Sequence, residues 1–132
     1  MESQRREIYT SKPIDRKYQF SPAVMYSKAG LIFISGMVGW DENGNIPDIG
    51  DPAAQARRAF ENLKDVLAEV GGTLEDVVME TEYVVDMAHY KEIGRIRNEY
   101  FPTNRPAATL VEVRRLFKPD LLFEIQALAV TR

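Results

Sequence analysis

The chain contains no cysteine and a single histidine, His89, among its 132 residues. The absence of cysteine excludes disulfides, thiolate nucleophiles and cysteine-based zinc sites. One histidine cannot build a metal cluster alone. We therefore expect a protein that holds no metal and no other cofactor.

The sequence also lacks a surplus of positive charge and a long apolar run. Its formal net charge is -3 and its pI is near 5.2, so it has no excess of cations to neutralise phosphates, and nucleic acid is not an expected partner. No apolar stretch approaches the length of a membrane span, and the polar start "MESQRREIYT" lacks the apolar run of a signal peptide. We expect no membrane contact and a cytoplasmic location.

What the chain does have is the composition of one globular domain. Its 132 residues suffice for one core but not for two, so we expect a single domain over residues 1–132. Hydrophobic residues make up 45% of the chain and charged residues 28%, and both values are ordinary for a folded globular protein.

Strand and helix signals alternate along the chain in a definite order. The first helix is expected from Pro52, because Asp51 can cap its free amides, and Gly71 and Gly72 end it. The second helix is expected over 87–101, and a loop over 39–52 contains Trp40. The expected strands cover residues 6–10, 23–27, 31–38, 77–85, 108–113 and 121–131.

The resulting order, βββαβαββ, predicts an α+β sandwich in which two helices cover one face of one sheet. The last strand is apolar on both faces: Leu121, Phe123, Ile125, Ala127 and Ala129 point to one side, and Leu122, Leu128 and Val130 point to the other. Two helices can cover only one face, so the other face needs a cover that a chain of this length cannot supply. We infer a homo-oligomer with the open sheet face turned inward.

Glu124 interrupts the apolar pattern of the last strand. An ionised carboxylate in such a row costs free energy unless it is paired or hydrated. One interpretation is a structural ion pair with Arg114 or Arg115 of the preceding segment. The other is a general acid or base, or a group that positions water, in a small cleft.

Other candidate site residues carry weaker signals. Ser35 and Gly36 end the strand "LIFISGMV", where a backbone can approach a ligand, although a bulge or turn is the commoner cause of such a pair. Thr109 offers a hydroxyl and an amide, but threonine is also a common strand residue. Trp40, in its loop, is a candidate lid. In the second helix Tyr90, Ile93 and Tyr100 have the spacing of a core stripe, whereas Arg95 and Arg97 are expected to be exposed.

Several segments together resemble the YjgF/YER057c/UK114 family, also called the RidA or reactive-intermediate deaminase family. They are "LIFISGMVG", "QARRAFENLKDVLAEVGGTLEDVV", "YVVDM", "NEYFPTNRPAATLVEV" and "LLFEIQALAV". The resemblance implies a chorismate-mutase-like fold and a homotrimer whose sheets form a central barrel, with a site at each subunit interface. It also implies hydrolysis of enamines or imines to carbonyl compounds and ammonia.

Carried over position by position, the resemblance assigns roles to named residues. The family glutamate falls on Glu124, the Ser-Gly pair on Ser35 and Gly36, and the backbone that follows the family's arginine on Thr109 and Leu110. That arginine, which clamps a substrate carboxylate, falls on Ala108, and a methyl group does not replace a guanidinium.

Two further family residues are also replaced by smaller ones: a tyrosine falls on Ala23 and an asparagine on Gly94. Together with Ala108, these exchanges predict a wider, less polar pocket and a ligand that is larger or less anionic than 2-iminopropionate, such as an aminomuconate-like acid. A basic residue such as Arg105 or Arg97, or a lysine, could still hold a carboxylate from a neighbouring subunit.

The sequence therefore favours an enamine or imine deaminase. We expect Glu124 to be its catalytic residue, and we expect its small-molecule substrate to be bound by Ser35, Gly36, Ala108, Thr109, Leu110 and Trp40. The alternative is a trimer of the same fold that binds or senses a metabolite without converting it. Ribonuclease activity, attributed to some family members, is the least favoured hypothesis because the chain is acidic and lacks a histidine pair.

Overall fold

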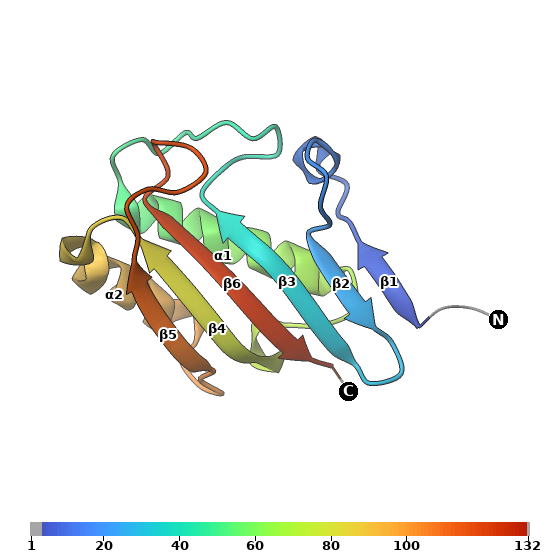
Figure 1. The fold of residues 1–132 in the computed structure, drawn as a ribbon. Coiled ribbons are helices and arrows are strands. Elements are labelled where there is room, and N and C mark those ends of the chain that lie inside the picture. The colour runs from blue at the N-terminus through green and yellow to red at the C-terminus, as the bar shows by residue number, and fades with distance from the viewer. Residues whose placement is uncertain (1–3, 132) are drawn as a thin grey trace.

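The computed structural model describes residues 4–131 and contains one mixed sheet of six strands with both α-helices on the same face (Figure 1). The strand order is β1-β2-β3-β6-β4-β5, and only β4 and β5 run parallel. The strands are β1 (Arg5–Ile8), β2 (Ala23–Tyr26), β3 (Leu31–Val38), β4 (Val77–Val84), β5 (Ala107–Glu112) and β6 (Phe123–Val130). The helices are α1 (Pro52–Ala68) and α2 (Tyr90–Tyr100), with short 3-10 turns at Pro13–Arg16, Leu74–Asp76 and Met87–His89.

This order confirms the predicted βββαβαββ arrangement with two helices on one face. The expected single domain over residues 1–132 includes residues 1–3 and 132, which lie outside the described part of the chain.

The first helix begins and ends where local chemistry predicts. Asp51 Oδ1 accepts a hydrogen bond from the Ala54 amide at 3.0 Å, and Pro52 occupies the first turn. At the other end Gly71 has φ 72°, and the Gly72 amide donates to the Leu67 carbonyl at 2.9 Å. This left-handed glycine terminates α1 and turns the chain toward β4.

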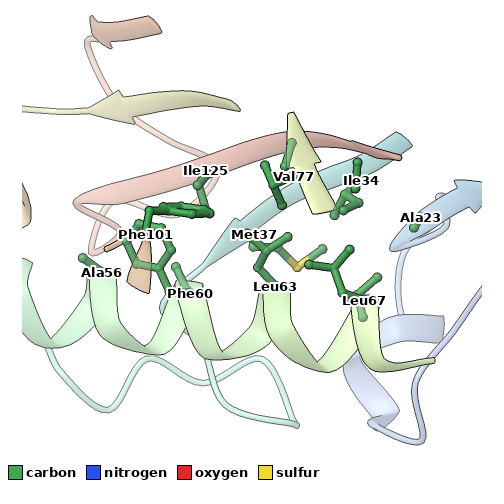
Figure 2. Close-up of a cluster of buried hydrophobic side chains, with 14 of the residues drawn as sticks. Ala23, Ile34, Met37, Ala56, Phe60, Leu63, Leu67, Val77, Phe101 and Ile125 are labelled. Carbon is green, nitrogen blue, oxygen red and sulfur yellow. The ribbon is translucent and has the colours of Figure 1, made fainter. Parts of the chain in front are cut away.

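The hydrophobic core lies between α1 and the sheet (Figure 2). Phe60 and Leu63 of α1 are fully buried against side chains such as Ile34 of β3 and Ile125 of β6. Gln55, also buried, donates through Nε2 to the Asp120 carbonyl at 2.9 Å and accepts at Oε1 from the Leu122 amide at 2.8 Å. These bonds satisfy a buried amide and fix the segment that leads into β6.

The two faces of β6 differ as predicted. Phe123, Ile125, Ala127 and Ala129 are buried under the helices, while Glu124, Gln126, Leu128 and Val130 alternate with them on the other face. That second face also has large exposed side chains on neighbouring strands, including Phe33 at 48% exposure and Met79 at 52%. No element within residues 4–131 covers this open face.

Two expectations about the second helix are wrong. Tyr90 is 46% exposed, so it is not part of a core stripe, although Ile93 is buried and Tyr100 stacks on Phe60 with ring centroids 5.0 Å apart. Arg97 is not a free surface charge, because its guanidinium pairs with buried Glu82 of β4. Arg95 is exposed as expected.

Candidate functional site

Glu124 lies on the open sheet face beside a bulge in β3. It stands opposite Val38 on one side and Tyr83 of β4 on the other. A Cβ atom at Gly36 would overlap the Glu124 carboxylate. Glycine at position 36 therefore provides the space in which this carboxylate lies.

Ser35 and Gly36 form the bulge itself, because the pairing of β3 with β6 shifts register between Ile34 and Met37. They lie within β3 rather than at its end. The Ser35 hydroxyl donates to the Ser21 carbonyl at 2.6 Å, and the Ser35 amide donates to the Pro22 carbonyl at 2.8 Å. Both Ser35 donors are thus used within the chain, and Gly36 is the member of the pair that faces the cavity.

The cavity in front of Glu124 is small and mainly aromatic. Its volume is about 220 Å³, and it is lined by Tyr18, Phe20, Gly36, Val38, Trp40, Phe117, Leu121 and Glu124. Burial among these groups raises the pKa of the Glu124 carboxyl above its usual range. A carboxyl in this position can accept a proton and return it.

The ion-pair interpretation of Glu124 is wrong. Across residues 4–131 no ion pair includes this carboxylate. Arg115 instead donates to the carbonyls of Leu116 and Phe117, both at 3.1 Å. The carboxylate therefore has no cationic neighbour to lower its pKa.

Aromatic side chains from three loops build the cavity wall around Tyr18. Its ring stacks with Trp40 at 6.0 Å between centroids and with Phe20 at 6.3 Å, and it meets Phe117 edge-on at 5.2 Å. Tyr18, Phe20 and Phe117 were not among the site residues predicted from the sequence. The sequence signal for them is the occurrence of aromatic residues in the loop segments "KYQF" and "RRLF".

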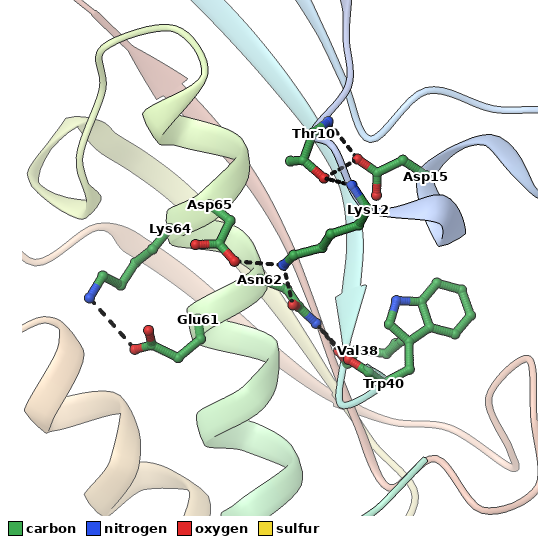
Figure 3. Close-up of polar contacts among 9 residues, drawn as sticks. All are labelled: Thr10, Lys12, Asp15, Val38, Trp40, Glu61, Asn62, Lys64 and Asp65. Carbon is green, nitrogen blue, oxygen red and sulfur yellow. Dashed lines mark hydrogen bonds and ion pairs between the residues drawn. The ribbon is translucent and has the colours of Figure 1, made fainter. Parts of the chain in front are cut away.

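Trp40 is held in place by α1 (Figure 3). Asn62 Nδ2 donates to the carbonyls of Val38 and Trp40 at 2.9 and 3.1 Å, and Lys12 Nζ donates to Asn62 Oδ1 at 2.9 Å. These bonds anchor the backbone at Trp40, whose ring lines the cavity, and its role as a lid stays a prediction. The hollow on the other side of this loop, about 630 Å³, contains both acidic and basic side chains, several of them paired with one another.

A second cavity, between α2 and β5, contains the other predicted site residues. Its volume is about 480 Å³, and it is lined by Glu80, Glu82, Met87, Tyr90, Arg97, Ala108, Thr109 and Leu110. On the parallel pair β4–β5, Ala108 stands opposite Glu80 and Leu110 opposite Glu82. Within one chain the structure thus groups Glu124 with Gly36 and Trp40, and places the Ala108–Leu110 segment in a separate cavity.

Three ionisable side chains in this α2/β5 cavity form a cluster that was not predicted from the sequence. Arg97 Nη1 donates to both carboxylate oxygens of Glu82, at 3.1 and 3.2 Å. Glu80, two residues earlier on the same strand, is 1% exposed, and neither of its oxygens accepts a hydrogen bond. Burial, and next the adjacent Glu82, raises the pKa of Glu80 to about 9, so this carboxyl is protonated at neutral pH.

The three departures from the family pattern have different consequences. Ala23 is buried in the core and lines neither cavity, so the expectation that it widens the pocket is wrong. Gly94 is buried beneath Arg97, where a Cβ atom would lie 3.4 Å from Nη2. Ala108 does line the α2/β5 cavity. Arg97 provides no free clamp there, since Glu82 offsets its charge.

Within residues 4–131, no group of three or more His, Asp or Glu side chains is placed to hold a metal ion. None of the helices described is long and apolar enough to cross a membrane.

Comparisons with known proteins show which family this chain resembles. The family described as "Endoribonuclease L-PSP" matches residues 10–131. The chain is 40% identical over 110 residues to the 3-aminoacrylate deaminase RutC of Acinetobacter baylyi. The aligned region covers 83% of this chain and 86% of the relative.

Solved structures resemble the whole fold. A Mycobacterium tuberculosis member of the YjgF/YER057c/UK114 family is 31% identical with a TM-score of 0.81, covering 96% of this chain and 99% of that one. YyfA of Yersinia pestis, described as a protein of unknown function of the Rid family, is 26% identical with a TM-score of 0.88 and the same coverage of each chain.

Proposed function

Because the chain belongs to the Endoribonuclease L-PSP family, which is the YjgF/YER057c/UK114 or Rid family, we propose that it hydrolyses a reactive enamine or imine to a carbonyl compound and ammonia. The observation that carries this proposal is Glu124, a half-buried carboxyl without a cationic partner, facing an aromatic cavity beside a glycine bulge. The 40% identity to a 3-aminoacrylate deaminase supports the reaction class.

The proposed chemistry needs one water molecule and one group that moves protons. An enamine first takes a proton on carbon and becomes an iminium ion. Glu124 then accepts a proton from water as the water oxygen bonds to the iminium carbon. It returns this proton to the nitrogen of the resulting carbinolamine. The C–N bond then breaks and ammonia leaves, while Glu124 takes the hydroxyl proton as the carbonyl forms and releases it to solvent, which replaces the proton that the enamine took up. The aromatic walls, including Tyr18 and Trp40, keep other water away from the carboxyl.

We further propose that one RidA-like domain spans residues 1–132 and that the complete site forms between copies of the chain in a homotrimer. The open sheet face, with Phe33 and Met79 exposed, is the apolar surface that a central barrel would bury. Such an assembly would bring the Ala108–Leu110 segment of one copy toward Glu124 of another. Substrate contacts by Gly36, Trp40, Ala108, Thr109 and Leu110 are part of this proposal, whereas Ser35 supports the bulge.

The test is ammonia release by the purified protein from freshly generated enamines and imines, including 3-aminoacrylate, 2-iminopropionate and an aminomuconate-like acid. Glu124→Ala should remain folded and lose most of the enzyme-dependent rate, because no other carboxyl lines its cavity. Gln126→Ala, on the same face of β6, is the matched control and should retain activity. Equal rates with wild type and Glu124→Ala would contradict the proposed mechanism.

Two other functions make different predictions in the same assay. A metabolite-binding or sensing protein would bind one of these compounds reversibly and release no ammonia. A ribonuclease would need groups that bind phosphate. The Glu124 cavity instead contains a carboxylate, which repels phosphate, and aromatic rings, which carry no positive charge to attract it.

A further inference from the structure

The cavity in front of Glu124 extends from the interior of the chain to its surface. Two of its lining residues, Val38 and Leu121, are only 4% and 1% exposed. Two others, Phe20 and Phe117, are 55% and 63% exposed. A small molecule can therefore enter this cavity from solvent and reach an apolar interior.

The exposed rim of the cavity is aromatic. Phe20 and Phe117 both contact the Tyr18 ring, yet more than half of the surface of each remains in water. Large apolar side chains that gather on a surface commonly mark a binding site. The Tyr18 and Trp40 rings lie within 10° of parallel and form a flat wall. These surfaces suit a ligand that is itself flat and apolar.

The volume of the cavity limits the size of such a ligand. It is about 220 Å³, whereas an apolar protein cavity of about 150 Å³ is large enough to bind benzene. The cavity in front of Glu124 therefore has room for one six-membered ring and a short chain.

The charges around the cavity indicate what the ligand lacks. Glu124 lines it, and no Lys, Arg or His of residues 4–131 does. Two nearby lysines have other contacts: Lys118 Nζ donates to the Gly44 carbonyl at 2.8 Å, and Lys17 Nζ lies 5.7 Å from the Tyr18 ring centroid. A ligand carboxylate would lie near the Glu124 carboxylate, and no lining cation would offset their repulsion.

The α2/β5 cavity, which the proposed trimer would bring toward Glu124, adds no free cation. Arg97 is the one cation that the described part of the chain places in its lining, and Glu82 offsets the charge of Arg97. Ala108 contributes a methyl group there. Neither cavity therefore supplies a clamp for a carboxylate.

We propose that the substrate is an imine or enamine with one aromatic ring, joined by a short chain to the carbon that bears nitrogen, and with no carboxylate. This inference rests on the proposed function, whose site the substrate occupies. The ring packs against Tyr18, Trp40 and Phe117, and the carbon that bears nitrogen faces Glu124. The protonated substrate is a cation, which the carboxylate and the ring faces stabilise. One water is consumed, and the products are an aryl-alkyl ketone or aldehyde and ammonia.

Four freshly generated ketimines test the ring and the carboxylate separately. 1-Phenylpropan-2-imine and 2-imino-3-phenylpropionate share the ring, and the first has a methyl group where the second has a carboxylate. Propan-2-imine and 2-iminopropionate are the same pair without the ring. Each forms from its N-chloroamine by loss of hydrogen chloride. We expect kcat/KM for ammonia release from 1-phenylpropan-2-imine to exceed each other value at least about tenfold.

Phe117→Ala tests the aromatic rim. Because Phe117 is 63% exposed, its removal leaves the core intact. We expect the preference for 1-phenylpropan-2-imine over propan-2-imine to fall at least about threefold. The matched control is Ile49→Ala. Ile49 is 66% exposed and lies in the loop that contains Trp40, but it does not line the cavity, so the wild-type preference should remain.

Binding can be measured without turnover, because Trp40 is the single tryptophan of the chain and lines the cavity. Tryptophan fluorescence is titrated with 3-phenylpropanamide, 3-phenylpropionate and propanamide. We expect 3-phenylpropanamide to bind at least about tenfold more tightly than either other probe.

A higher kcat/KM for either imino acid, equal rates with and without the ring, or tighter binding of 3-phenylpropionate would each overturn the proposal. A preference for imino acids that is lost in Arg105→Ala would also overturn it and would identify Arg105 as the carboxylate clamp. Hydrolysis of all four imines at similar rates would contradict the substrate class and leave the deaminase in place. No hydrolysis, with selective binding of 3-phenylpropanamide, would contradict the deaminase and support the aromatic ligand class.

Discussion

Glu124 and Gly36 show how much single residues decide in this site. Glu124 was predictable from the sequence because it interrupts an apolar strand. Gly36, which gives the Glu124 carboxylate its space, was predictable only as a position where the backbone could approach a ligand. The structure supplies the reason, since any side chain at position 36 would occupy the place of the Glu124 carboxylate.

Gly36→Ala should therefore impair activity far more than stability. The displaced group is the end of a flexible side chain, so we expect a free energy of unfolding within about 1 kcal/mol of wild type. We expect the rate of ammonia release to fall at least about tenfold, since the carboxyl loses its position. Urea unfolding and the ammonia assay, run on the same preparation, measure the two effects. A variant with wild-type activity would show that the close approach of Gly36 and Glu124 has no role in turnover.

At the scale of helices and strands, local signals predicted most of the fold. Asp51, Pro52 and Gly71 mark the ends of α1 because caps and left-handed turns depend on short stretches of chain. The alternation of residue types in β6 likewise distinguishes its buried residues from those on the open face. These features depend on neighbours in sequence, so the sequence suffices for them.

Contacts between elements were not predictable in the same way. Arg97 was expected to be an exposed helix charge, yet it reaches β4 and pairs with buried Glu82. The alternating glutamates in "METEYVV" were a usable signal, of the same kind as Glu124, but only the packing of α2 over β4 identifies their partner. Likewise, Ala23 was assigned to the pocket by position in a motif, whereas it faces the core.

For the whole molecule, the open face of the sheet is the feature that one chain leaves incomplete. The proposed trimer buries this face and has a mass of about 45 kDa, three times the 15.1 kDa of one chain. Phe33→Asp should disrupt it, because each copy would place a charge in an apolar interface.

Light scattering coupled to size exclusion measures the mass of wild type and of Phe33→Asp. We expect the trimer mass for the first and the monomer mass for the second, with ammonia release lost in the monomer if the site forms between copies. Glu69→Lys, a charge change at the exposed end of α1, is the control and should remain trimeric. A monomeric wild-type chain with full activity would contradict an interfacial site.

The measurement that tests the central claim most directly is the pH dependence of kcat/KM for ammonia release, corrected for the uncatalysed reaction, in wild type and Glu124→Gln. Glu124 must be ionised to accept a proton from water, and burial raises its pKa. The wild-type rate should therefore fall as pH decreases, with an apparent pKa above the usual 4.5 of a glutamate. Glu124→Gln should lose both this limb and most of the rate. An unchanged limb in Glu124→Gln would show that another group performs the proton transfer.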